Sequence, residues 1–246
     1  MIRQFDYIIE LAEEGNTDAM VQAIQEFVWN EHLDIKMTPE IRDKVVEYLD
    51  RAIKEGNVSA MNQLGAMFAE GRMVERDPQM AFAFYEMASE AGDALATSNL
   101  GFCYYYGNGT EKNYEQAFKA FSKAASLNVM DAYIKLADMY FYGEYVKQDR
   151  ETAFKMYIKA KNNAKSFLQD WGAIQVYSDA CGRIGDCYAQ GQGVEKDIVE
   201  ASLYYGQAVY YYALREKKND SYSHKSFIRT IEKYKKVLEE LPDNIK

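Results

Sequence analysis

The side chains best suited to nucleophilic or metal chemistry in this chain are three cysteines and two histidines. Cys103 and Cys187 each lie two residues after a glycine, and Met67 and Met139 hold the equivalent positions elsewhere. A position shared by Met and Cys is typical of a buried apolar site, so we interpret these thiols as core residues. The odd number of cysteines and the lack of a Cys-x-x-Cys pair favour neither a disulfide framework nor a zinc site.

The histidines and glycines do not complete a catalytic motif. His32 and His224 lie near opposite ends of the chain, and neither has further ligands at metal-site spacing. Without a central histidine, a Cys or Ser nucleophile would lack its usual base. Gly107-x-Gly109 and Gly191-x-Gly193 lack the third glycine or the Lys-Ser/Thr of phosphate-binding loops. We therefore expect no catalytic site, no metal site and no cofactor.

Carboxylates remain as candidates for the paired acids of a hydrolase. Asp131, Asp138, Asp179 and Asp186 stand in segments with helical periodicity. Charged residues of such helices usually form the solvated face. We interpret these four carboxylates as solvent-exposed rather than catalytic.

A period of 36 residues organises the chain from residue 60 to residue 160. Leu64, Leu100 and Leu136 stand 36 residues apart, and the residue after each is Gly, Gly or Ala. The same spacing relates Gly71, Gly107 and Gly143, then Ala81, Ala117 and Ala153, then Ala88, Ala124 and Ala160. A fixed period of this length is typical of a solenoid, whose units cannot each bury a core alone.

Each unit is predicted to contain two short helices. Phe84, Tyr85 and Ala88 follow Ala81 by three, four and seven residues, which places all four on one face of the second helix. Gly65 in the first helix leaves no side chain between neighbouring helices, so that Tyr85 can fill the space beside it. A helical glycine costs roughly 1 kcal/mol relative to alanine, which indicates a packing need that outweighs this cost.

A glycine-containing turn separates the two helices of a unit. Its first glycine fits a left-handed C-terminal cap. Six residues later comes a short oxygen-bearing side chain that is predicted to cap the next helix, namely Asp77, Asn113, Asp149 or Asp197. Met73 and Tyr145 replace the second turn glycine in two units, which leaves the geometry of those turns open.

These residues resemble the Sel-one-like repeat, a relative of the tetratricopeptide repeat. The best match is Ala180-x-x-x-Ile184-Gly185-x-x-Tyr188-x-x-Gly191-x-Gly193-Val194-x-x-Asp197. The resemblance covers about residues 59 to 209. It implies an all-α fold, a right-handed α-α superhelix (solenoid) of about five helix-turn-helix repeats with capping helices at both ends.

We expect a single solenoid over residues 1–246. Its predicted parts are an N-terminal cap helix (1–17), a degenerate repeat (18–57), regular repeats (58–93, 94–129 and 130–165), a repeat with an insertion (166–215) and a C-terminal cap helix (216–246). Gly143 and Gly191 stand 48 residues apart rather than 36, so 12 residues are inserted. Longer helices over 161–168 and 173–190 are the simpler account, and a separate loop is the alternative.

Charge and hydropathy argue against several classes of partner. The formal net charge is −9, from 29 Lys and Arg against 38 Asp and Glu, whereas binding to nucleic acid or anionic lipid favours a basic face. No signal peptide is evident, and no stretch approaches the roughly 18 apolar residues of a membrane helix. We therefore expect a cytoplasmic protein that binds neither nucleic acid nor membrane.

The resemblance further implies a concave groove lined by first-helix residues. The predicted partner-binding residues are Asn62, Glu70, Ser98, Phe102, Tyr105, Tyr106, Ile134, Asp138, Phe141, Tyr142, Asp186 and Gln190, with Ala66, Ala69, Gly182 and Ala189 at equivalent positions. None is Lys or Arg. Exposed aromatic side chains with Asp138 and Asp186 at the rim would form a binding patch, which favours a partner with basic and apolar residues over a small-molecule substrate.

The leading functional hypothesis is a non-enzymatic scaffold or adaptor that binds a peptide or protein partner in this groove, as such repeat proteins generally do. The first alternative is a cytoplasmic inhibitor or immunity protein that neutralises one toxin or enzyme. The second is a hydrolase similar to the cysteine-rich β-lactam-binding relatives of the family. The missing cysteine pairs and export signal count against the hydrolase.

Overall fold

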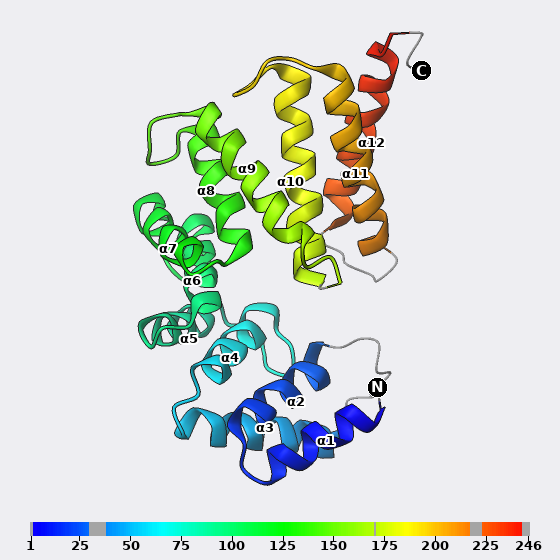
Figure 1. Cartoon of the computed structure of the whole chain (residues 1–246). Helices are drawn as coiled ribbons and strands as arrows, with labels where there is room; N and C mark the ends of the chain where they lie inside the picture. Colours follow the sequence, from blue (N-terminus) through cyan, green and yellow to red (C-terminus); the bar gives the residue numbers. More distant parts are fainter. Residues whose placement is uncertain (1, 30–37, 170, 217–222, 243–246) are drawn as a thin grey trace. The chain divides into compact units, whose positions relative to one another are not determined.

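The computed structural model describes residues 2–29, 38–169, 171–216 and 223–242. These residues form twelve α-helices and no β-strand (Figure 1), which confirms the all-α prediction. The chain divides into two compact units, Met1–Ala120 and Phe121–Lys246. That the two units form one continuous solenoid stays a prediction.

The first unit is built from consecutive helices that pack pairwise. They are α1 (Ile2–Glu13), α2 (Thr17–Trp29), α3 (Pro39–Lys54), α4 (Val58–Glu70), α5 (Pro78–Glu90) and α6 (Ala94–Tyr106), followed by the first half of α7 (Tyr114–Ser126). Each helix from α1 to α5 contacts the next. Met20, Ile24 and Tyr48 are fully buried in a core shared by α1 to α4.

The second unit repeats the arrangement with longer helices. After the end of α7 it contains α8 (Met130–Tyr142), α9 (Arg150–Lys165), α10 (Trp171–Gln190), α11 (Ile198–Glu216) and α12 (Ser223–Glu240). Each helix from α8 to α11 contacts the next along the chain, and the last of them contacts α12. None of the helices in the described part of either unit is long and apolar enough to cross a membrane.

The turns follow the capping chemistry that the residue types predict. Gly71, Gly107 and Gly143 end their helices in the left-handed conformation. Asp77 accepts hydrogen bonds from the backbone N–H groups of Gln79 and Met80, both at 3.0 Å. The predicted caps Asn113, Asp149 and Asp197 accept equivalent bonds at the starts of α7, α9 and α11. Each of these four helices, α5, α7, α9 and α11, therefore begins where a side-chain oxygen satisfies free backbone donors.

The second turn position requires a left-handed backbone in every unit. A Cβ atom at Gly109 would lie 1.9 Å from the carbonyl oxygen of Pro78, so only glycine fits there. Met73 and Tyr145 adopt the same conformation with φ angles of 62° and 66°. Met73 and Tyr145 therefore form the same turn as glycine does in the other units, which the sequence did not decide. A positive φ angle is unfavourable for these two residue types.

Small residues allow close contact between the two helices of a unit, as predicted. A Cβ atom at Gly65 would lie 2.9 Å from the ring of Tyr85, and one at Gly185 would lie 2.7 Å from the ring of Tyr205. The alanines at the other repeated contact position are fully buried: Ala88, Ala124, Ala160 and Ala208. The aromatic ring thus takes the space that the absent side chain leaves.

The inserted residues lengthen helices, which decides between the two alternatives. The helices α4 to α8 have 13 residues each, whereas α9 has 16 and α10 has 20. Ala164 near the end of α9 and Ala173 near the start of α10 are fully buried. The longer helices therefore extend the core of the second unit.

Candidate functional site

The first helices of the repeats, α4, α6, α8 and α10, carry the predicted partner-binding residues, and burial separates them into two groups. The residue three before the repeat glycine is buried in three helices: Asn62, Ser98 and Ile134. The fourth, Gly182, would place a Cβ atom 3.8 Å from the Tyr212 hydroxyl. Asn62, Ser98 and Ile134 are covered by the surrounding structure, so the prediction that they line an exposed groove is wrong. Gly182 is half-buried.

The last residue of each first helix is exposed instead. These residues are Glu70, Tyr106, Tyr142 and Gln190, which all precede the capping glycine of the turn. Tyr106 keeps 54% of its surface exposed and Tyr142 keeps 64%. Ala66, Ala69 and Ala189, as well as Phe102, Tyr105 and Phe141, are half-buried. The exposed part of the predicted surface therefore centres on the C-terminal ends of these helices.

Tyr106 belongs to an aromatic cluster at the end of α6. Its ring stacks on Phe102 with centroids 6.3 Å apart and meets the edge of Tyr105 at 4.8 Å. Tyr105 also contacts Tyr114 at 5.3 Å, and the Lys112 ammonium lies 4.4 Å above the Tyr114 ring. We name these four aromatic residues the α6 cluster. Their contacts hold Tyr106 in a defined position at the surface.

Tyr142 occupies the same repeat position at the end of α8. Its ring meets the edge of Phe141 at 5.1 Å, and Phe141 lies 6.4 Å from the buried Tyr157. The guanidinium of Arg150 lies 5.4 Å from the centre of the Phe141 ring. In both helices a half-buried aromatic side chain supports an exposed tyrosine, with a cation close to the supporting rings.

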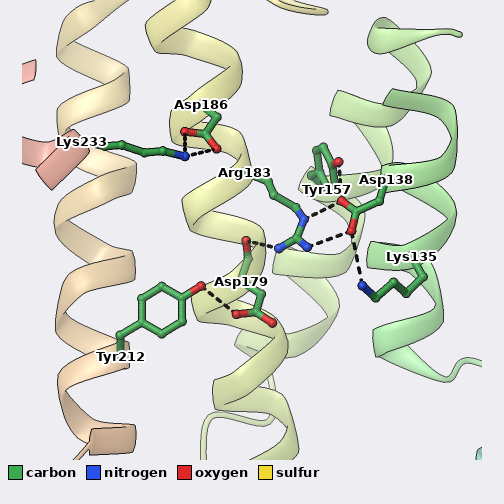
Figure 2. A network of polar contacts seen from close by, with 8 residues as sticks. All are labelled: Lys135, Asp138, Tyr157, Asp179, Arg183, Asp186, Tyr212 and Lys233. Carbon is green, nitrogen blue, oxygen red and sulfur yellow. Dashed lines mark hydrogen bonds and ion pairs between the residues drawn. The ribbon is translucent and has the colours of Figure 1, made fainter. Parts of the chain in front are cut away.

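Asp138 does not contribute to the predicted acidic rim, because it is buried in a polar network of the second unit (Figure 2). Nε and Nη2 of Arg183 donate to its two carboxylate oxygens at 2.6 and 2.8 Å. The Tyr157 hydroxyl donates to it at 2.8 Å, and the Lys135 ammonium lies 3.8 Å away. This carboxylate is therefore neutralised inside the protein, and the prediction that it is solvent-exposed is wrong.

The pKa values follow from this arrangement. Burial alone would raise the pKa of Asp138, but the charge and hydrogen bonds of Arg183 outweigh burial and hold that pKa below its ordinary value. Burial likewise opposes the charge of Arg183, and Asp138 keeps the pKa of Arg183 well above its usual value. Burial and the nearby carboxylate also raise the pKa of Tyr157. An ionised Asp138 paired with a charged Arg183 is the stable state of the network.

Two further aspartates on α10 are also paired. The Lys233 ammonium of α12 donates to both oxygens of Asp186 at 2.6 and 2.7 Å, and the Tyr205 hydroxyl donates at 2.6 Å. Asp179 accepts from the Tyr212 hydroxyl at 2.7 Å. Asp186 thus links α10 to α11 and α12 and does not present a free charge to a partner. Figure 2 shows the contacts of Lys233 with Asp186 and of Tyr212 with Asp179 beside those of Asp138.

The cations of this network are residues that the sequence analysis missed. A signal for them exists, because Lys135-Leu-Ala-Asp138 and Arg183-Ile-Gly-Asp186 place a cation three residues before an aspartate in successive first helices. In the first unit the equivalent cation positions hold Gln63 and Asn99. The Asn99 amide donates to the Asn62 side chain at 3.0 Å. The spacing marks Lys135 and Arg183, but the main partner of each aspartate lies on a later helix, α10 for Asp138 and α12 for Asp186, and is set by tertiary structure.

The candidate nucleophiles are placed as the repeat pattern predicts. Cys103, Cys181 and Cys187 are buried free thiols. Burial raises the pKa of Cys103 to about 11 and the pKa of Cys181 and Cys187 to about 12, so all three are protonated at neutral pH. Nδ1 of His224 lies 2.8 Å from a Glu216 carboxylate oxygen, and His32 lies outside the described residues. Among the described residues, no three His, Cys, Asp or Glu side chains form a metal-binding group.

Comparison with known proteins gives a family match and several related folds. The family model described as Sel1 repeat matches residues 58–93, 94–129, 131–164 and 178–214, together more than half of the chain. The chain is similar to the crystal structure of a Sel1 repeat protein from Oxalobacter formigenes, with 24% identity and a TM-score of 0.61 over 79% of this chain and 73% of that one. A search of curated proteins finds no match.

Two further structures share the fold. One is a protective antigen with an SLR fold from uropathogenic Escherichia coli, with 21% identity and a TM-score of 0.56, covering 96% of this chain and 56% of that one. The other is an immunity protein from Pseudomonas aeruginosa, with 22% identity and a TM-score of 0.52, covering 80% of this chain and 66% of that one. At these identities the likeness shows the fold alone.

Proposed function

Because the chain belongs to the Sel1 repeat family, we propose that it is a non-enzymatic interaction scaffold that binds a protein or peptide partner. The proposed anchors are Tyr106 in the first unit and Tyr142 in the second, the exposed tyrosines at the ends of α6 and α8, and each is proposed as an anchor of its own unit. The observation that carries the proposal is that two equivalent repeat positions each expose more than half of a large aromatic side chain. Exposed aromatic residues of this kind are enriched at protein interfaces.

The support beneath each tyrosine strengthens the proposal. Phe102 and Tyr105 contact Tyr106, and Phe141 contacts Tyr142. A side chain that is already held in place loses little conformational entropy when a partner covers it. Tyrosine also offers a hydroxyl at the edge of an apolar ring, so that one side chain can supply contact area and a hydrogen bond.

The ion pairs seen in the structure remove the reason to expect a basic partner at these tyrosines. The expectation of a basic partner at these helices depended on Asp138 and Asp186, which are matched by Arg183 and Lys233. The cations nearest the aromatic groups are Lys112 and Arg150. We therefore base this interaction on aromatic contact and assign it no preference for a basic segment.

Affinity capture with the parent protein, followed by titration of the captured partner, tests the proposal. We expect Tyr106→Ala and Tyr142→Ala each to weaken binding by about 1–3 kcal/mol, because aromatic anchors dominate interface energies. Tyr210→Ala is the matched control, since Tyr210 is 60% exposed on the second helix α11. If both anchor variants bind like the parent, or the control loses as much affinity, neither tyrosine is an anchor.

The inhibitor hypothesis is the second candidate and uses the same surface. The fold that the chain shares with an immunity protein is compatible with it, although the likeness carries no information about the partner. It requires that the captured partner is an enzyme or toxin whose activity falls as the chain is added in equal amount. A captured partner without such activity favours the scaffold.

A further inference from the structure

An apolar face is exposed on α5, a second helix that carries none of the predicted binding positions. Met80, Ala83 and Met87 follow one another by three and four residues and so share one side of the helix. Met80 is 41% exposed and Met87 is 49% exposed. Ala81, Tyr85 and Ala88 on the opposite side are buried in the core. We name Met80, Ala83 and Met87 the α5 methionine face.

The equivalent faces of α7 and α9 are polar. At the positions of Met80, Ala83 and Met87, α7 carries Gln116, Lys119 and Lys123, and α9 carries Thr152, Lys155 and Lys159. Lys119 and Lys155 form ion pairs with glutamates one turn earlier, at 2.7 and 2.5 Å. Lysine is thus compatible with the repeat at two of these positions. The apolar face on α5 is a local departure that the fold does not require.

Carboxylates border the same face. Glu86 and Glu90 lie on one side of the α5 methionine face, and α5 contains no Lys or Arg. Among the described residues, neither carboxylate forms a salt bridge. On the other side, the Phe84 ring stacks on Phe68 of α4 with centroids 5.8 Å apart. The surface therefore combines flexible apolar side chains with a negative border.

We propose that the α5 methionine face binds a basic amphipathic helix of a partner protein. Such a helix places apolar residues at intervals of three and four against Met80 and Met87 and its Lys or Arg side chains beside Glu86 and Glu90. Methionine is unbranched and polarisable, so it adapts to apolar side chains of different shapes. The charge of the border selects a basic segment over an acidic one.

This surface includes neither Tyr106 nor Tyr142, and its occupant has different chemistry. The inference therefore does not depend on the proposed anchors. It concerns the first unit alone, because α4 and α5 both lie within Met1–Ala120.

Fluorescence anisotropy with a labelled peptide tests the inference on the full chain. The probe is a synthetic amphipathic helix of Leu and Lys, about 15 residues long so that it can form a stable helix on binding. A second peptide with Glu in place of every Lys is the charge control. We expect saturable binding of the Leu/Lys peptide and an affinity for the Leu/Glu peptide that is at least about tenfold weaker.

Two double variants locate the site. Met80→Lys/Met87→Lys makes the face polar, as it is in α7 and α9, which carry Gln116 or Thr152 at the position of Met80 and a lysine at the position of Met87. We expect this variant to weaken binding of the Leu/Lys peptide about tenfold or more. Glu86→Gln/Glu90→Gln should weaken binding about threefold and reduce its dependence on salt, because neutral amides no longer attract the lysines. Circular dichroism checks that both variants keep their helix content.

A matched control separates this site from attraction by the net charge of the whole chain. Glu232→Gln/Glu239→Gln removes the same number of charges from α12 in the second unit. Its affinity for the Leu/Lys peptide should remain within about twofold of the parent. Sedimentation of the parent and of Met80→Lys/Met87→Lys at several concentrations should show the same mass for both.

Three results would overturn the inference. The first is no saturable binding of the Leu/Lys peptide at concentrations up to about 100 μM. The second is unchanged affinity after Met80→Lys/Met87→Lys, or an equal loss in the α12 control. The third is self-association of the parent that the methionine variant abolishes, since this would identify a second copy of the chain as the occupant.

Discussion

Replacing Asp138 by alanine should be among the most destabilising single changes in the second unit. The variant removes a buried carboxylate that receives two hydrogen bonds from Arg183 and one from the Tyr157 hydroxyl. Removing one partner of a buried ion pair costs about 3–5 kcal/mol, because the other charge stays buried without compensation. The Arg183 side chain keeps 29% of its surface exposed, so water can partly solvate it, and we expect about 3 kcal/mol.

Urea unfolding followed by circular dichroism measures this loss. In a thermal scan, 3 kcal/mol corresponds to a decrease in Tm of about 6–12 °C for a chain of this size. The double variant Asp138→Leu/Arg183→Leu should recover more than half of the loss, because it removes both charges. The remaining deficit should come from the Tyr157 hydroxyl, which loses its acceptor.

Asp186→Ala is the matched control for burial. Asp186 is also an ion-paired aspartate on a first helix, but its side chain is 27% exposed and that of Lys233 is 35% exposed, against 8% for Asp138. More exposed pairs contribute about 0–1 kcal/mol, so this variant should be much less destabilised. Equal losses in Asp138→Ala and Asp186→Ala, or a loss below about 1 kcal/mol for Asp138→Ala, would refute the argument from burial.

Three further measurements examine the same structure. Gly185→Ala should cost about 1–3 kcal/mol of unfolding free energy, because the new Cβ atom would lie 2.7 Å from the Tyr205 ring; an unchanged urea midpoint would contradict that contact. A thiol reagent at neutral pH should react slowly with the folded chain and rapidly with three thiols in urea, because all three cysteines are buried, and rapid labelling without urea would show otherwise. The pKa of Asp138 is lowered in the folded state, so its stabilisation is present above the unfolded value of about 3.9 and is lost as pH falls through the folded pKa. Parent and Asp138→Asn should therefore converge in stability as pH falls below about 4, whereas a constant difference down to the acid unfolding of the chain would exclude the linkage.

The local features of the repeat could be predicted from sequence because they depend on residues close together in the chain. Gly107 and Asn113 mark a helix end and the next helix start, since the left-handed cap and the side-chain cap act on neighbouring backbone groups. The contact of Gly65 with Tyr85 also joins residues within one unit. Because the units repeat every 36 residues, a role predicted for one residue also applies to its equivalents, as it does for the buried Ala88, Ala124 and Ala160.

The predicted surface was less well determined, because exposure depends on what packs against a helix. Asn62, Ser98 and Ile134 follow the spacing of a groove position, yet neighbouring helices cover them. Only the residues at the helix ends, such as Tyr106 and Tyr142, remain exposed there. A position in a repeat specifies a direction on its own helix, and the adjacent helix decides whether that direction leads to solvent.

The charged residues show most clearly which features the sequence determines and which depend on tertiary structure. The sequence contains Asp138 and Asp186 at equivalent positions, and periodicity alone assigned both to an exposed acidic rim. The structure pairs Asp138 with Arg183, 45 residues later, and Asp186 with Lys233, 47 residues later. The sequence determined that these side chains lie on first helices. Only the tertiary structure decided that their charges are matched, because an electrostatic partner is set by distance in space and by burial.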